Sequence, residues 1–237
     1  MTKQVFITGA SSDIGEILCH HYLADGYTVL GQVNRGSSKF NDLMHKSGGR
    51  VLKINIDFSA PQETSAQLHL HREQIMKSDI LINLAGLYES TKFGNIDHEE
   101  IFKAFAVNTV PAFLLMQMVG PEMAKRQRGR IVNVGSIGTK FGGGADSFCY
   151  SLSKHALEFM PSAVNKWAKD NVLVNTLRVG VTRTRFHDTN KDMAKRVELI
   201  PAKRMAEPSE VASTIFWFGS DQNTFTTGQV LDVAGGE

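Results

Sequence analysis

The stretch FITGASSDIGEIL, residues 6–18, decides the fold class of this chain. The apolar residues 5–7 predict a buried strand, a small-residue turn follows, and Ile14, Ile17 and Leu18 then share one face of a helix. A glycine-rich turn that leads from a strand into a helix N-terminus is suited to hold a pyrophosphate, because the first N–H groups of the helix lack partners. This spacing alone is a weak signal, so a glycine-rich turn without a ligand stays open as the alternative.

Asp13 stands in this turn where a third glycine is expected. Aspartate is among the best N-cap residues, so Asp13 is predicted to cap the helix with its carboxylate turned away from the phosphates. A cofactor site disabled by this carboxylate is the alternative. The turn supplies six candidate cofactor-binding residues: Gly9, Ser11, Ser12, Asp13, Ile14 and Gly15.

Six further apolar runs follow along the chain, at residues 28–33, 50–56, 79–83, 130–134, 172–179 and 229–233. Most are nearly continuous rather than alternating, which is typical of strands covered on both faces. Helical patterns separate them, and this alternation predicts parallel strands joined by crossover helices. We therefore expect an α/β fold: one doubly wound parallel sheet of about seven strands with helices on both faces, in a single domain over residues 1–237.

The composition is that of an ordinary globular protein. The 237 residues are 42% hydrophobic and 21% charged, and the formal charge of +2 is too small to favour nucleic acid as a partner. No apolar run is expected to span a membrane, and strand-like sequence from Gln4 onward leaves no room for a signal peptide. Cys19 and Cys149 lack metal or redox spacing, so no metal site is expected and a cytoplasmic location is predicted.

The end of the second run bears on cofactor choice. An acidic residue there would bind the ribose 2′-hydroxyl of NAD, whereas a nearby arginine accommodates the 2′-phosphate of NADP. The sequence continues with Asn34, Arg35 and Ser37 and has no carboxylate at these positions. NADP(H) is therefore predicted in preference to NAD(H), with a solvated basic loop as the alternative.

Four residues form a candidate catalytic set. Ser136 follows an apolar run, and Tyr150 and Lys154 are separated by four positions, which places both on one face of a helix. Asn108 lies on an earlier helical stretch. Each residue alone has an ordinary structural explanation.

These motifs together resemble the short-chain dehydrogenase/reductase family, in its compact single-domain branch with a Rossmann-type fold. The resemblance rests on TGASSDIG, DILINLAG, VNTVPAF, GRIVNVGS, YSLSK, RVGVTRT and the closing IPAKRMAEPSEVASTIFWFGSD and TGQVLDVAGG, and it covers essentially the whole chain. It implies that Tyr150 is the general acid or base and that Lys154 holds the nicotinamide ribose and favours the tyrosinate. It also implies that Ser136 hydrogen-bonds the substrate oxygen and that Asn108 supports a proton relay.

The resemblance implies further cofactor contacts and an oligomer. Asp57 and Phe58 would meet the adenine, Asn83, Ala85 and Gly86 would support the ribose side, and Thr182 and Thr184 would hold the carboxamide and pyrophosphate. Residues 183–205 would form a lid over the substrate, called the lid segment below. A homodimer or homotetramer is implied, although Pro161, predicted to kink the helix after Lys154, puts the interface in doubt.

Three functions are weighed on this basis. The first is an NADP-dependent oxidoreductase for a free small carbonyl or secondary alcohol. The second is a carrier-protein-linked β-ketoacyl reductase, in which the basic residues Lys125, Arg126, Arg128 and Arg130 would dock an acidic carrier. The third is a non-catalytic dinucleotide sensor, supported only by Asp13 and by Leu84, which replaces a family asparagine. Residues 183–204 carry a net charge of +4, which leaves an anionic substrate and a solvated lid helix equally open.

Overall fold

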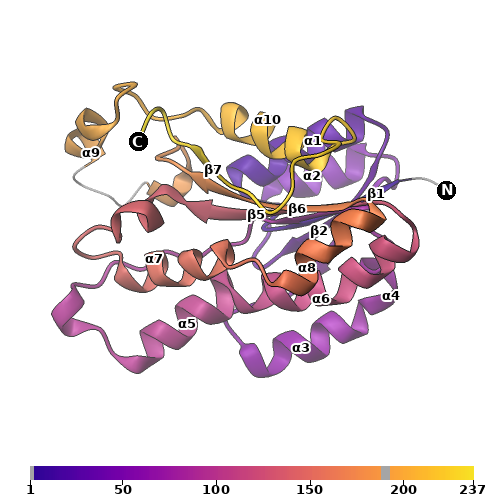
Figure 1. The fold of residues 1–237 in the computed structure, drawn as a ribbon, viewed down its shortest axis with the longest axis horizontal. Coiled ribbons are helices and arrows are strands. Elements are labelled where there is room, and N and C mark those ends of the chain that lie inside the picture. Colours follow the sequence, from indigo (N-terminus) through magenta and orange to yellow (C-terminus); the bar gives the residue numbers. More distant parts are fainter. Residues whose placement is uncertain (1–2, 188–192) are drawn as a thin grey trace.

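Seven strands form one parallel sheet in the computed structural model, which describes residues 3–187 and 193–237. Their order across the sheet is β3-β2-β1-β4-β5-β6-β7 (Figure 1). The strands are β1 (Gln4–Thr8), β2 (Thr28–Val33), β3 (Val51–Asn55), β4 (Ile80–Asn83), β5 (Gly129–Ser136), β6 (Val172–Val179) and β7 (Val230–Val233). The predicted doubly wound α/β sheet is confirmed, and each predicted run overlaps one of these strands.

Helices cover both faces of the sheet (Figure 1). One face carries α1 (Asp13–Ala24), α2 (Ser38–Lys46) and α10 (Pro208–Gly219). The other carries α3 (Pro61–Leu70), α4 (Arg72–Ile75), α5 (His98–Asn108), α6 (Val110–Lys125), α7 (Phe148–His155) and α8 (Ser162–Asn165). The short α9 (Met193–Leu199) belongs to the lid segment.

The continuous apolar runs arise because the sheet has a hydrophobic core on each side. On β1, Val5 and Ile7 pack into the core beneath α1 and α10, whereas Phe6 between them packs into the core beneath α6. Alternate side chains of a strand point to opposite faces, so a strand buried on both faces must be apolar at every position.

One helical stretch has the length and composition of a membrane-spanning helix. The helical stretch His98–Lys125, which joins α5 and α6, is long and apolar enough to cross a membrane by composition alone. In the structure, Leu115, Met116, Val119 and Met123 of α6 are buried in the core against the sheet. The stretch is therefore explained as core helices of a globular fold.

Pro161 precedes a new helix instead of kinking the predicted one. The helix with Tyr150 and Lys154 stops at His155, a 3-10 turn covers Ala156–Glu158, and Pro161 then precedes α8 as its N-cap. A proline has no N–H to continue the helical bonding, so the chain breaks and restarts here. The catalytic pair lies wholly before the break.

The strand order reverses between β1 and β4, which places a crevice at their carboxyl ends. Thr8, the last residue of β1, accepts hydrogen bonds at its hydroxyl from the N–H groups of Leu84 and Ala85, which follow β4. The predicted phosphate turn and the segment after β4 are thereby fixed side by side.

Candidate active site

Ser12, and not Asp13, caps α1. The Ser12 backbone is extended and its hydroxyl accepts a hydrogen bond of 3.1 Å from the N–H of Gly15. Asp13 is already the first residue of the helix, so its side chain does not occupy the N-cap position. The predicted capping by Asp13 is wrong; its carboxylate instead accepts two hydrogen bonds from Arg185 of the lid segment.

The two glycines of the turn have the steric roles expected from the sequence. Gly9 has a φ of +66°, and a Cβ there would lie 3.1 Å from the Cα of Ala85. A Cβ on Gly15 would lie 2.5 Å from the carbonyl oxygen of Gly9, closer than real Cβ atoms come to a backbone oxygen. Only glycine lets the helix approach the turn this closely. Ser11 and Ile14 lie in the same turn, both partly buried.

Gln32 supports the turn from the next strand, a role that its position in the sequence did not suggest. It is buried near the end of β2, and its side chain bonds the N–H of Gly9 and the carbonyl of Ile56. By sequence, position 32 differs only in lacking the acidic residue that would bind the ribose of NAD. Its polar side chain within an apolar strand was the available signal, because buried polar groups need partners.

The predicted adenine end gathers beyond β2 and β3. The hydroxyl and N–H of Ser59 have the largest effect in lowering the pKa of the Asp57 carboxyl. Arg35 and Asn34 also lie close enough to lower it. Phe58 differs from expectation, because its side chain is buried in the core beneath α6 and leaves only its backbone for a ligand. The hydroxyl of Ser37 is also engaged, since it caps α2 and donates to Glu16.

The four predicted catalytic residues meet at the carboxyl end of β5. Tyr150 and Lys154 lie one turn apart on α7, Ser136 ends β5, and the Ser136 hydroxyl lies close enough to Tyr150 to act on the pKa of its phenol. Lys154 is 3% exposed, and its Nζ donates to the carbonyls of Val134 at 2.9 Å and Ala85 at 3.2 Å. Asn108 ends α5 and bonds both backbone groups of Leu87.

Burial shifts both titrating groups of the helix toward their neutral forms. It raises the pKa of Tyr150 to about 12, although the nearby Ser136 hydroxyl acts to lower that pKa. It lowers the pKa of Lys154 to about 8. Tyr150 is therefore protonated at neutral pH and can donate its proton. Lys154 does not lower the pKa of the phenol in this structure.

Two aromatic residues beside Tyr150 were not among the sequence-predicted site residues. The ring of Tyr88, after β4, lies 5.5 Å from that of Tyr150, and the ring of Phe186, in the lid segment, lies 5.8 Å from it. Tyr88 and Phe186 also contact each other, with ring centroids 6.0 Å apart. Sequence gave no signal for this cluster, because its three members come from separate segments.

The segment after β4 offers a small, open position beside the lysine. Gly86 is exposed, and a Cβ there would lie 3.3 Å from Lys154 Nζ and 3.5 Å from Asn108 Oδ1. Ala85 adjoins it and is partly buried. Asn83 is instead buried and donates to Asn133, while its own Oδ1 has no partner among the described residues.

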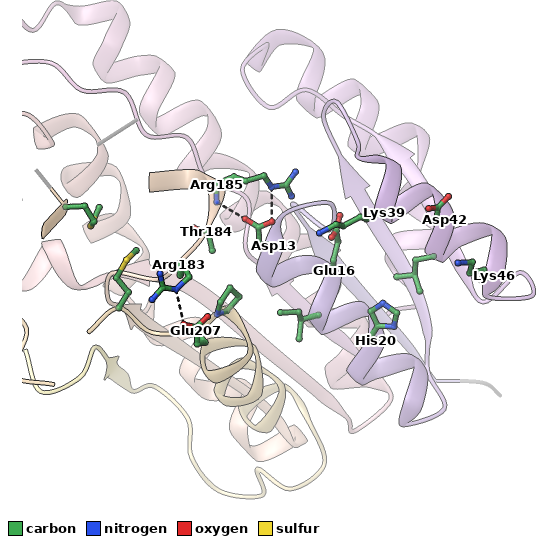
Figure 2. A pocket seen from close by; sticks show the side chains of 15 residues that line it. Asp13, Glu16, His20, Lys39, Asp42, Lys46, Arg183, Thr184, Arg185 and Glu207 are labelled. Atoms are coloured by element: carbon green, nitrogen blue, oxygen red, sulfur yellow. Dashed lines mark hydrogen bonds and ion pairs between the residues drawn. The ribbon is translucent and has the colours of Figure 1, made fainter. Parts of the chain in front are cut away.

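The beginning of the lid segment lies against the phosphate turn. Thr182 is buried and its hydroxyl donates to the carbonyl of Gly180, whereas Thr184 is partly exposed. Thr184 lines a hollow of about 950 Å³ that also includes Asp13, Glu16 and Arg185 and lies between α1, α2 and the lid segment (Figure 2). Residues 188–192 of the predicted lid lie outside the described residues.

These features fit a nicotinamide dinucleotide. The N-terminus of α1 and the glycine turn would hold the pyrophosphate, Arg35 and Asp57 lie where the adenosine would end, and the Lys154 ammonium beside Gly86 would hold the nicotinamide ribose. Among residues 3–187 and 193–237, no group of three or more His, Cys, Asp or Glu side chains is placed to hold a metal ion.

Known proteins share this architecture over the whole chain. The family described as short chain dehydrogenase matches residues 3–195. A 2-dehydro-3-deoxy-D-gluconate 5-dehydrogenase of Bacillus subtilis is 28% identical, covering 99% of this chain and 94% of its own. A 3-oxoacyl-[acyl-carrier-protein] reductase of Buchnera aphidicola is 30% identical, covering 99% and 96%.

Solved structures agree in fold. A 3-oxoacyl (acyl-carrier-protein) reductase of Agrobacterium tumefaciens with NADP bound superposes with a TM-score of 0.87 at 22% identity, covering 99% of this chain and 94% of that one. A 4-hydroxyisoleucine dehydrogenase complexed with NADH has the same TM-score at 26% identity, covering 99% and 98%. The family match, the sheet order and the cluster around Tyr150 point to the same family. The chain belongs to the short chain dehydrogenase family.

Proposed function

We propose that this protein is an NADPH-dependent reductase, reversible as an alcohol dehydrogenase, that acts on a free small carbonyl compound. The observation that carries the proposal is the arrangement around α7, where Tyr150 stands one turn from the buried Lys154 and beside Ser136 at the end of β5. A protein that only senses a dinucleotide has no need of this pair.

Bound NADPH would supply the hydride for the carbonyl carbon. As the carbon–oxygen π electrons move onto the oxygen, Tyr150 donates its proton there, and Ser136 donates a hydrogen bond to the same developing oxyanion. Lys154 would hold the ribose and stabilise the tyrosinate left behind. Asn108 fixes the backbone of Leu87 next to this lysine, and we assign it a supporting role in returning the proton.

Arg35 supports NADP over NAD. It follows β2 with no carboxylate at the preceding positions, and the nine-residue helix α2 begins three residues later. A guanidinium beside a helix N-terminus suits a 2′-phosphate. The hydroxyl of Ser37 does not add to this site, because it donates to Glu16.

The lid segment supports an uncharged substrate. Five of its basic side chains are paired with carboxylates, as Arg183–Glu207, Arg185–Asp13, Arg196–Glu237, Lys203–Glu198 and Arg204–Glu210. The lid residue that contacts Tyr150 is the aromatic Phe186, opposite Tyr88. We therefore propose a ketone or aldehyde with an apolar substituent.

The basic stretch before β5 does not support docking of a carrier protein at the active site. Arg130 is buried and bonds the carbonyl of Asn223, Arg126 bonds those of Met76 and Ser78, and Arg128 pairs with Asp221. The stretch also lies at the amino end of β5, while Ser136 lies at the carboxyl end, about 20 Å away at roughly 3.3 Å per residue.

We further propose a homo-oligomer in the cytoplasm. Phe102 of α5 is 70% exposed, and α5 packs against α7, whose Leu152 is 39% exposed. An apolar surface of this kind suits contact with a second copy. Cys19 and Cys149 are both free thiols, as a reducing compartment would keep them.

The test is NADPH consumption at 340 nm with a panel of aryl ketones, aldehydes, sugar-derived ketones, quinones and β-ketoacyl thioesters. Tyr150→Phe should abolish turnover and leave NADPH binding nearly unchanged, because it removes only the proton donor. Tyr27→Phe, a like change distant from the site, is the control. Turnover by Tyr150→Phe at the native rate would overturn the proposal, and a carrier-bound thioester as the best substrate would replace it with the carrier-linked function.

A further inference from the structure

Arg185 of the lid segment is fastened to the phosphate turn by three hydrogen bonds. Its backbone N–H and its Nε donate to the two carboxylate oxygens of Asp13, each at 2.8 Å (Figure 2). Its Nη2 donates to the carbonyl of Ser11 at 3.2 Å. The contacts join residues 172 positions apart. The guanidinium thus lies on the turn that the proposed function assigns to the pyrophosphate.

The electrostatics of this turn need a cation. Asp13 and Glu16 both lie in the first turn of α1, where they stabilise the helix but oppose an arriving pyrophosphate. Glu16 receives the hydroxyl of Ser37, which brings no charge, whereas Asp13 receives the charged guanidinium of Arg185. With Arg185 in place, the carboxylate of Asp13 is neutralised at short range.

The guanidinium also keeps donors for a ligand. It has five N–H donors, and its hydrogen bonds to Asp13 and Ser11 use one on Nε and one on Nη2. Arginine binds phosphate oxygens well through such a planar set of donors. The Arg185 side chain is 57% exposed, so a ligand on the turn can reach it.

We propose that Arg185 is a pyrophosphate-binding residue of this chain and that Asp13 is its positioning residue. The inference rests on the proposed use of a dinucleotide. It explains why a carboxylate occupies the phosphate turn: the carboxylate aims an arginine that the turn itself does not contain.

The same pair lies next to a residue that packs on the catalytic tyrosine. Phe186 follows Arg185 directly, and its ring contacts those of Tyr150 and Tyr88. A pyrophosphate held by Arg185 would therefore also stabilise the contact between Phe186 and Tyr150.

The test measures the dissociation constant of NADPH by its fluorescence for the native chain and for Arg185→Ala, Asp13→Gly and the double variant. Arg185→Ala should weaken NADPH binding about tenfold or more, because it removes a charge-assisted contact and leaves Asp13 unpaired. The double variant should bind about threefold or more tighter than Arg185→Ala alone, because the unpaired carboxylate is gone. Arg185→Lys should recover part of the loss.

Two controls separate a pyrophosphate contact from a general loss of structure. Arg183→Ala removes a neighbouring lid arginine that pairs with Glu207, and it should change NADPH affinity less than about threefold. Adenosine 2′-monophosphate lacks the pyrophosphate, so its competition against NADPH should reveal the same affinity for native and Arg185→Ala chains.

Native affinity for NADPH in Arg185→Ala would overturn the inference and leave the proposed function standing. An equal loss for adenosine 2′-monophosphate, or a double variant as weak as Arg185→Ala, would also overturn it. A native chain that binds neither NADPH nor NADH would remove the proposed function together with the inference.

Discussion

The side-chain oxygen of Gln32 accepts a hydrogen bond of 2.8 Å from the backbone N–H of Gly9. The amide nitrogen of the same side chain donates to the carbonyl of Ile56 at 2.6 Å. One buried amide therefore connects the end of β2 both to the phosphate turn after β1 and to the segment after β3.

Gln32→Leu should destabilise the protein and weaken NADPH binding. The change leaves the N–H of Gly9 and the carbonyl of Ile56 without these partners, which should lower the free energy of unfolding by about 2 kcal/mol or more. Urea unfolding measures this, with Gln62→Leu on the exposed side of α3 as the control. An unchanged urea midpoint for Gln32→Leu would contradict the role assigned to this amide.

Arg35→Asp should reverse the preference between NADPH and NADH. Loss of the charged contact to the 2′-phosphate should cost about 1.5–3 kcal/mol, and the new carboxylate can accept from the ribose 2′-hydroxyl of NADH. The ratio of kcat/KM for the two cofactors is the measurement. Lys46→Asp, the same charge change at the far end of α2, should leave that ratio unchanged. Equal use of NADH and NADPH by the native chain would refute the prediction.

Tyr150 should remain protonated at neutral pH in the absence of cofactor. Burial raises its pKa to about 12, so the phenolate forms only as the pH approaches that value. Difference absorbance at 295 nm between the native chain and Tyr150→Phe should show no tyrosinate below pH 10. Added NADP⁺ should move the ionisation to lower pH, because the positive nicotinamide favours the anion. A step below pH 9 without cofactor would sink this prediction.

Lys154 should make stability rise with pH between about 8 and 10.5. Its folded pKa of about 8 lies below the ordinary value of 10.5, so in this range the unfolded chain holds the proton that the folded chain has released. The unfolding free energy of the native chain minus that of Lys154→Met should therefore increase by up to about 3 kcal/mol from pH 7 to pH 10.5. The exposed Lys166→Met should show no such trend, and a flat profile for Lys154→Met would contradict the shift.

Three expectations from local sequence differ from the structure in detail. Capping by Asp13 was predicted from residue preference, but the N-cap depends on which residue first leaves the helical conformation, and that residue is Ser12. Phe58 was assigned to adenine by motif, but its side chain is buried in the core beneath α6, which leaves only its backbone for that contact. The helix predicted to continue through Pro161 ends at His155, and α8 begins after Pro161, which has no N–H to continue helical bonding.

Local sequence alone predicts the alternation of strands and helices, the steric need for Gly9 and Gly15, and the shared helical face of Tyr150 and Lys154. These follow from local periodicity, in which a continuous apolar run suits a doubly covered strand and a spacing of four suits a helix turn. Three contacts depend on the tertiary structure. Asp13 pairs with Arg185, Gln32 bonds the N–H of Gly9, and the rings of Tyr88 and Phe186 contact that of Tyr150. Each of these contacts joins separate βα units, and their mutual placement depends on how the whole sheet and its two cores assemble.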